Sequence, residues 1–220
     1  MTRRFVFGGF FAVFIASAQL NAQFTLGIRI GTSSNGVQLN RDTPIKVSHR
    51  INGLPGTMGL MSGFQFSHRW GLEMGLNYTV KGYDDNTLGA PQSTTPGNKA
   101  TGFRFHYAEL CPQLTFRWKP EFSLKMGGYA GYLFKREGRN PGFNNWDPLS
   151  DGFDGFFRDL DAGLSASFSV CYQRLSFFVQ FQQGLFPIAA FNYSTSSDTA
   201  EVRMYNRTFM LGVGYALLER

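Results

Sequence analysis

Six charged residues stand in segments that are otherwise almost uncharged, beside glycine, serine and glutamine at alternate positions: Arg29, Glu73, Lys81, Glu109, Arg117 and Lys125. An isolated ion is costly to bury, so charges that share a confined interior must form ion pairs or hydrogen bonds. The spacing predicts that Glu73 pairs with Arg117, and that Glu109 pairs with Lys81 or Arg29. Such a set would form a polar plug. The alternative chemistry is a pathway for a small solute or a proton.

The histidines are the candidate general bases for hydrolysis: His49, His68 and His106. A hydrolase of this kind needs a histidine within hydrogen-bond reach of its nucleophile. His106 is the best candidate, but neither His106 nor His49 has a serine two residues onward, as a lipid A deacylase-type barrel would. The sequence therefore predicts that the protein is not an enzyme. A lipid-modifying enzyme stays as an alternative.

Residues 137–156 and their flank combine carboxylates with aromatic side chains. The spacing of Asp147, Asp151 and Asp154 does not fit a calcium-binding EF-hand loop, and we expect no metal and no cofactor. Large apolar side chains are unusual in a free surface loop, so a contact with lipid or a protein partner is predicted. The residues of this predicted contact loop are Phe143, Trp146, Phe153, Phe156 and Phe157.

The two cysteines, Cys111 and Cys171, fall at different distances from their nearest turns. An oxidising compartment would allow a disulfide, but strands rise about 3.3 Å per residue, which separates the two thiols. We expect free thiols that face inward.

Strict alternation of bulky and small side chains predicts the elements that carry these residues. In residues 209–217, Phe209, Leu211 and Val213 share one face, whereas Gly212 and Gly214 share the other. A period of two is typical of β-strands. The pattern is found in eight segments in all: residues 24–31, 58–67, 72–81, 108–118, 122–134, 160–173, 175–182 and 209–217.

The connections between these segments alternate between short and long. The short ones are residues 68–69, 119–121 and 173–174, and the long ones are residues 32–56, 82–101, 137–156 and 187–203. This rhythm is typical of an outer-membrane barrel, with short periplasmic turns and long extracellular loops. We therefore predict an all-β, eight-stranded, antiparallel up-and-down transmembrane β-barrel.

The volume of the side chains on the two strand faces distinguishes this predicted barrel from a soluble, lipocalin-like one. The interior of an eight-stranded barrel is just wide enough for side chains to fill, so the bulky face must point outward. Aromatic residues also gather near both ends of the strands, as expected for girdles at two membrane interfaces. One group is Phe66, Trp70, Trp118, Phe122, Tyr172 and Phe177, and the other is Tyr78, Phe103, Phe105, Tyr132, Phe134 and Phe209.

The amino-terminal residues predict export. Arg3 and Arg4 precede an apolar stretch over residues 5–18, which is the pattern of a signal peptide. Cleavage after Ala22 would leave residues 23–220 as a single barrel domain, and Ala18 offers an alternative site. Net charge falls from +6 to about +4 without residues 1–22, which gives no indication of a nucleic-acid partner. Both termini of the mature chain are expected in the periplasm.

Several of these segments together resemble a known family. They are the Gly27 and Gly31 spacing, residues 71–82, the run from Tyr107 to Pro112, the glycine-aromatic strand over residues 127–132, and residues 209–215. The chain is similar to the PorT-like outer-membrane β-barrel proteins of the Bacteroidetes, whose namesake takes part in type IX secretion and gliding. Two positions depart from that pattern: Cys111 beside the proline, and a chain end that is not aromatic. The resemblance implies insertion by the barrel-assembly machinery.

The function predicted from these observations is a non-enzymatic outer-membrane barrel with a plugged polar lumen. It would act as a structural or accessory subunit of an envelope assembly, with a secretion-related role implied by the resemblance. Expected partners are outer-membrane lipid, lipopolysaccharide, the barrel-assembly machinery during insertion, and other envelope proteins. The first alternative is a narrow, porin-like channel for small solutes.

Overall fold

The computed structural model describes residues 23–39, 49–84, 102–139, 146–149, 157–194 and 199–219. Every secondary-structure element within these residues is a β-strand. No helix within these residues is long and apolar enough to cross a membrane. The predicted signal peptide, residues 1–22, lies outside the described residues. The wall of the barrel consists of β1 (Gln23–Leu39), β2 (His49–Gln65), β3 (Trp70–Asp84), β4 (Gly102–Lys119), β5 (Phe122–Arg139), β7 (Leu160–Tyr172), β8 (Leu175–Gly184) and β10 (Thr199–Glu219).

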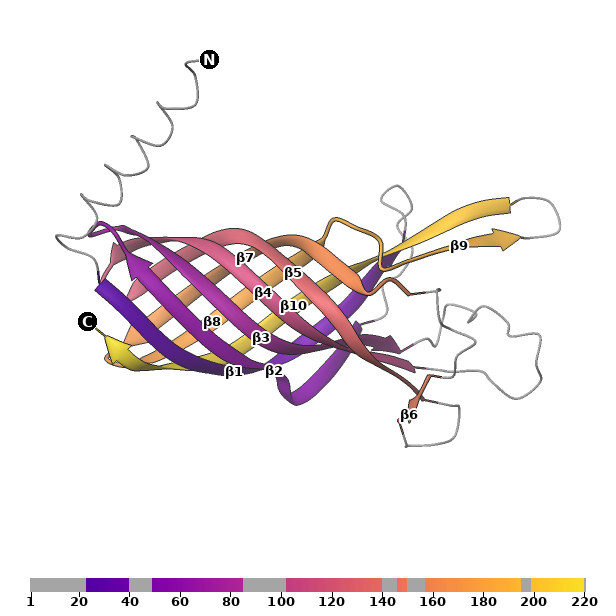
Figure 1. Ribbon diagram of the computed structural model, residues 1–220, viewed down its shortest axis with the longest axis horizontal. Coiled ribbons are helices and arrows are strands. Elements are labelled where there is room, and N and C mark those ends of the chain that lie inside the picture. The colour runs from indigo at the N-terminus through magenta and orange to yellow at the C-terminus, as the bar shows by residue number, and fades with distance from the viewer. Residues whose placement is uncertain are drawn as a thin grey trace, which may run out of the picture.

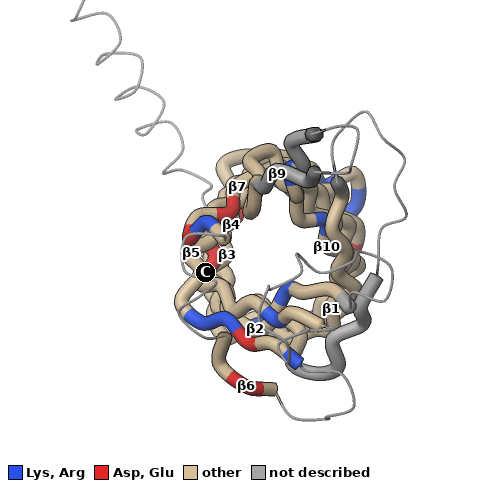
Figure 2. Tube along the Cα trace, turned by 90° about the vertical axis from the view of Figure 1, so that its right-hand side faces the viewer, with Lys and Arg blue, Asp and Glu red and all other residues tan. Residues whose placement is uncertain are grey.

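These eight strands form a closed ring. Each is paired antiparallel with the next in chain order, and β1 pairs with β10 from Thr25↔Glu219 to Leu39↔Met204. Figure 1 shows the tilted strands from the side, and Figure 2 shows the ring nearly end-on. Closure leaves no unpaired edge in the ring. The predicted fold class, an antiparallel barrel of eight strands, is confirmed.

The two ends of the barrel differ. Three short connections, residues 66–69, 120–121 and 173–174, lie at the end that also holds the carboxy terminus (Figure 1). We call it the turn end. The opposite loop end carries β6 (Asp147–Pro148), which pairs with β5, and β9 (Ala189–Ser194), which pairs with β10. All three short connections agree with the positions predicted from the sequence.

Side chains alternate between the lumen and the outer wall. On β4, Glu109, Cys111 and Gln113 are buried, whereas Leu110 and Leu114 are 46% and 44% exposed. The same holds on β7, where Ser165 and Ser167 are buried and Leu164 is exposed. The barrel therefore has a polar interior and an apolar outer wall, the reverse of a soluble protein.

The strands extend further toward the loop end than predicted. β1 and β2 run into the predicted loop of residues 32–56, and a hairpin of β9 and β10 occupies most of residues 187–203. The prediction fell short because hydrophobic alternation stops where the apolar outer wall stops. Backbone pairing continues beyond that level, since it depends on no side-chain type.

Candidate functional site: the barrel lumen

The inward side chains fill the lumen in layers that can be followed along β3. From the turn end to the loop end they are Glu73, Asn77, Lys81 and Tyr83. A charged cavity thus gives way to amides, then to a buried charge cluster, and finally to aromatic rings.

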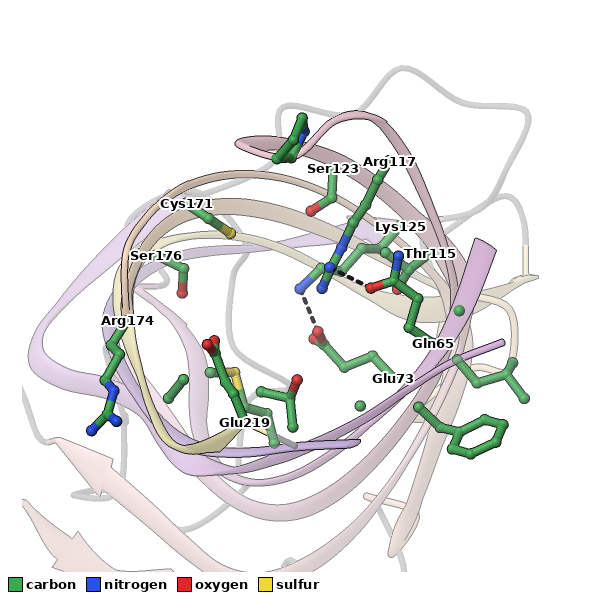
Figure 3. A pocket seen from close by; sticks show the side chains of 18 of the residues that line it. Gln65, Glu73, Thr115, Arg117, Ser123, Lys125, Cys171, Arg174, Ser176 and Glu219 are labelled. Carbon is green, nitrogen blue, oxygen red and sulfur yellow. Dashed lines mark hydrogen bonds and ion pairs between the residues drawn. The ribbon is translucent and has the colours of Figure 1, made fainter. Parts of the chain in front are cut away.

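A cavity of about 160 Å³ lies at the turn end. Figure 3 shows Glu73, Arg117, Lys125 and Gln65 converging on it from the barrel wall. Lys125 Nζ lies 2.6 Å from Glu73 Oε2, forming an ion pair with both side chains largely buried. Arg117 donates from Nη1 to the amide oxygen of Gln65.

The predicted pairing of Glu73 with Arg117 is wrong, because Lys125 takes the carboxylate and Gln65 holds Arg117. The register explains the difference. Glu73 stands opposite Gln113 on β4, and Arg117 lies four residues nearer the turn end. Lys125 pairs with Thr115, only two residues from Gln113, and so reaches Glu73 over the inner face of β4.

Glu73 and Lys125 should therefore show energetic coupling. In a double-mutant cycle with Glu73→Ala and Lys125→Ala, we expect a coupling energy of roughly 0.5–3 kcal/mol, because each single change leaves a partly buried charge. The cycle of Glu73→Ala with Arg117→Ala is the control and should be closer to additive. The measurement is urea-dependent folding into lipid vesicles, scored by the gel shift of the folded band. Stronger coupling to Arg117 than to Lys125 would contradict the register.

The next layer is built around Arg29. Its Nε donates to Asn77 Oδ1 at 2.6 Å and its Nη1 to Gln180 Oε1 at 3.3 Å. Gln180 and Gln113 each donate to the hydroxyl of Ser165, at 3.0 and 2.9 Å. Arg29 also lies over the ring of Phe178. Amide oxygens and an aromatic face, rather than a carboxylate, thus accommodate this guanidinium.

Lys81 lies at the centre of a fully buried charge cluster. Its Nζ is 2.6 Å from Glu109 Oε1 and 2.8 Å from Asp161 Oδ2, and the three side chains have no solvent exposure. Pairing with Lys81 was one of two predicted for Glu109, and it is the one present. The ammonium also lies 4.2 Å from the centre of the Tyr129 ring. We call Lys81, Glu109 and Asp161 the Lys81 cluster.

Hydrogen bonds from neighbouring strands satisfy the carboxylates of the Lys81 cluster. Glu109 Oε2 accepts from Thr79 at 3.0 Å and from Gln182 at 3.2 Å. Asp161 accepts from the Tyr129 hydroxyl at 3.0 Å and from Asn206 at 2.8 Å. The network joins β3, β4, β5, β7, β8 and β10, and it crosses the lumen from wall to wall.

Glycine makes room for this cluster. A Cβ atom on Gly131 would lie 3.2 Å from Glu109 Cγ and 3.3 Å from Tyr107 Cδ1, so a larger residue would crowd both side chains. Gly131 stands opposite Asp161 in the ladder between β5 and β7.

Aromatic side chains pack together inside the barrel on the loop-end side of the Lys81 cluster. Phe105 has no exposed surface, and its ring centre lies 4.7 Å from that of Phe157. Phe103 packs on the same ring at 5.7 Å, and Tyr83 packs on Phe103 at 5.2 Å. We call this group the loop-end plug, and its buried members are Val37, Tyr83, Phe103, Phe105, Tyr107, Leu133, Phe157, Ile188, Ala189 and Met204.

The loop-end plug corrects two predictions. Phe103 and Phe105, expected in a lipid-facing girdle, point into the lumen because they share the face of Tyr107 and Glu109 on β4. Phe157, expected in the contact loop, is buried against them. Trp146 lies 4.2 Å from the Arg104 guanidinium, in contact with its own chain. The other members of the predicted contact loop, Phe143, Phe153 and Phe156, lie outside the described residues.

Asp161 is the site residue that sequence reasoning missed. It shares a face with Gly163, Ser165 and Ser167, so alternation alone placed it inside the barrel. Its partner Lys81 is 80 positions away in the chain. That contact depends on the register of β3 to β7, which the face pattern does not contain.

His106 forms a hydrogen-bonded chain near the loop end. Its Nδ1 lies 2.6 Å from the Tyr78 hydroxyl, and its Nε2 lies 3.0 Å from Glu137 Oε2. Glu137 also pairs with Lys135 at 2.7 Å, and Phe134 packs beside His106. These partners include no serine, so the arrangement lacks the serine nucleophile of a hydrolase triad. The described contacts link His106, Glu137 and Lys135 in one ion network.

Both cysteines are free, with Cys111 buried and Cys171 lining the turn-end cavity. The inward-facing free thiols agree with the prediction. Among the residues that the structure describes, no group of three or more histidine, cysteine or acidic side chains is arranged to hold a metal ion.

A closed antiparallel ring with an apolar wall and a polar, ion-paired lumen defines a small transmembrane β-barrel. Residues 14–190 match the family described as "Outer membrane protein beta-barrel domain", and the chain belongs to that family. None of the curated proteins matches the chain.

Solved structures of small outer-membrane proteins are similar to this chain at low identity. Ail of Yersinia pestis, solved with the heparin analogue sucrose octasulfate, is 14% identical with a TM-score of 0.42, over 90% of this chain and 99% of Ail. Neisserial surface protein A is 9% identical with a TM-score of 0.48, over 89% and 98%. OprG of Pseudomonas aeruginosa is 15% identical with a TM-score of 0.41, over 89% and 95%.

Proposed function

We propose that this protein is a non-enzymatic outer-membrane barrel whose lumen is closed, and that it serves as a structural or accessory subunit of an envelope assembly. The single observation that carries the proposal is that buried side chains fill the lumen at two successive levels. The Lys81 cluster spans the lumen with ions that have no solvent exposure. The loop-end plug covers the cluster with packed aromatic rings. An eight-stranded interior leaves little further room for a path.

The proposed orientation places the turn end, with both termini of the mature chain, in the periplasm and the loop end outside the cell. Short turns at one end and long connections at the other support it, since bacterial barrels follow this rule. Insertion would use the barrel-assembly machinery. The resemblance to PorT-like proteins supports a secretion-related role, with contacts to other envelope proteins at either rim.

Planar-bilayer recording tests the closed lumen. Purified protein should give no stable unitary conductance steps, whereas an open porin incorporated in the same bilayers serves as the positive control. Stable steps that scale with the amount of barrel protein would contradict closure and favour the narrow-channel alternative. Co-purification of the native protein in mild detergent is expected to retain envelope partners, and a barrel recovered alone would count against the accessory role.

The alternative function, a lipid-modifying enzyme, is tested by mass spectrometry of lipid A. Lipid A from cells that overexpress the protein should give an unchanged mass spectrum. A loss of acyl chains would contradict the non-enzymatic proposal and direct attention to His106, whose bonds to Tyr78 and Glu137 order a base and an orienting carboxylate.

A further inference from the structure

A hollow on the outer wall near the loop end combines an apolar floor with arginine side chains. It is an open depression of about 770 Å³. Leu160 and Ala162 lie on the outward face of β7, and Phe186 follows the end of β8. Arg136 and Arg158 complete the lining together with Asp159 and Phe157.

The level of this hollow matches a membrane interface. Leu160 stands opposite Tyr132 in the ladder of β5 and β7, and Tyr132 and Phe134 are exposed on the outer wall. Aromatic rings of this kind sit at the boundary between hydrocarbon and head groups. Arg136 lies four residues beyond Tyr132 toward the loop end. The floor therefore faces acyl chains, whereas the arginines reach the head-group layer.

The described residues that line the hollow include two arginines, Arg136 and Arg158, and one acidic residue, Asp159. Arg136 donates to the carbonyl oxygen of Phe157 at 3.3 Å and forms an ion pair with Asp159, so these two side chains are held together. Arg158 is exposed, and its backbone N–H donates to Ile188 at 2.7 Å. None of the ion pairs among the described residues involves the Arg158 guanidinium, and Arg158 lines the apolar hollow.

We propose that this hollow binds one phosphorylated glycolipid of the lipid A class. A phosphate would lie against Arg158, with Arg136 at its side, and an acyl chain would lie along Leu160, Ala162 and Phe186. Arginine suits this role because its planar fork donates two hydrogen bonds to a phosphate. Basic pockets beside membrane-spanning segments bind anionic head groups by the same chemistry. The inference rests on the proposed orientation, which places the loop end in the outer leaflet.

Native mass spectrometry of the full barrel released from detergent tests the site, with bisphosphorylated lipid A as the probe. We expect one bound lipid A on the wild type and about tenfold weaker binding to Arg158→Glu, because a charge-assisted hydrogen bond is lost. Arg174→Glu, an equal charge change at the turn end, is the control and should bind as the wild type does. Dephosphorylated lipid A should bind the wild type about tenfold more weakly, a comparison that requires no variant.

Equal binding by Arg158→Glu and the wild type would overturn the site. Phosphatidylglycerol binding as tightly as lipid A would overturn the choice of lipid, since it would show a general anionic contact. The orientation is tested separately by labelling Arg158→Cys with a membrane-impermeant maleimide on intact cells, with Arg174→Cys as the control. Labelling at position 158 without lipid A selectivity refutes the site alone, whereas labelling only at position 174 refutes the orientation on which the inference rests.

Discussion

Replacing Lys81 with methionine is expected to lower the free energy of unfolding by about 3–5 kcal/mol. The change leaves two buried carboxylates without their cation, because Glu109 and Asp161 lie 2.6 and 2.8 Å from the Lys81 ammonium and have no solvent exposure. Methionine keeps most of the length and volume of lysine, so the loss reflects charge and not a cavity. Hydrogen bonds from Tyr129 and Asn206 hold Asp161 in place but supply no positive charge.

Urea titration of folding into lipid vesicles measures this loss, and the heat-modifiable gel band reports the folded fraction. The matched control is Lys135→Met. Lys135 pairs with Glu137 at 2.7 Å, but its side chain is 52% exposed, so the change should cost no more than about 1 kcal/mol. Adding Asp161→Asn to Lys81→Met should recover part of the loss, because one stranded charge disappears. Similar small losses for both lysines would mean that the Lys81 cluster is hydrated.

The sequence predicted which side chains of each strand face the lumen and which face outward. It did not predict the level of each inward side chain along the barrel axis. Alternation requires only that bulky residues such as Leu110 and Leu114 point outward, and it then places Glu109 and Gln113 inside. Short turns at His68 and Gln173 mark where the chain reverses. These local signals are enough for the ring of eight strands.

Contacts between inward side chains depend on the register of every strand pair that separates them. The assignment of Glu73 to Arg117 failed by four positions along β4, although both residues were correctly placed on the inward face. Asp161 was on the inward face as well, but its contact with Lys81 requires the pairings of β3 through β7 to be known. Periodicity specifies a face with a repeat of two residues and contains no information on longer offsets.

The loop-end plug shows a different limit of sequence reasoning. Phe105 and Phe157 are apolar residues inside a polar lumen, so residue type alone assigned them to lipid or to a partner. Side chains alternate strictly along β4, and this alternation, continued from Gln113 through Glu109 to Phe105, places Phe105 inside the barrel. The alternation therefore indicated an inward Phe105, but the prediction gave more weight to the general preference of aromatic residues for membrane interfaces.

Phe105→Ala is expected to lower the free energy of unfolding by about 3–5 kcal/mol, because it opens a cavity beside the rings of Phe157 and Phe103, whose centres lie 4.7 and 6.3 Å from that of Phe105. Phe105→Leu keeps much of the volume and is the control, with an expected loss below about 1.5 kcal/mol. The same urea titration measures both variants. Equal losses for alanine and leucine would indicate that the loops collapse around the site and that the plug is not close-packed.

The same variant separates the two levels of closure. Phe105→Ala weakens the loop-end plug but keeps Lys81, Glu109 and Asp161, whose ion pairs involve no atom of the Phe105 side chain. Folded Phe105→Ala should therefore stay non-conducting in planar bilayers, because the ion pairs still span the lumen. Unitary steps that appear in Phe105→Ala and not in Phe105→Leu would assign closure to the aromatic rings, and the Lys81 cluster would then serve to hold the wall of the barrel together.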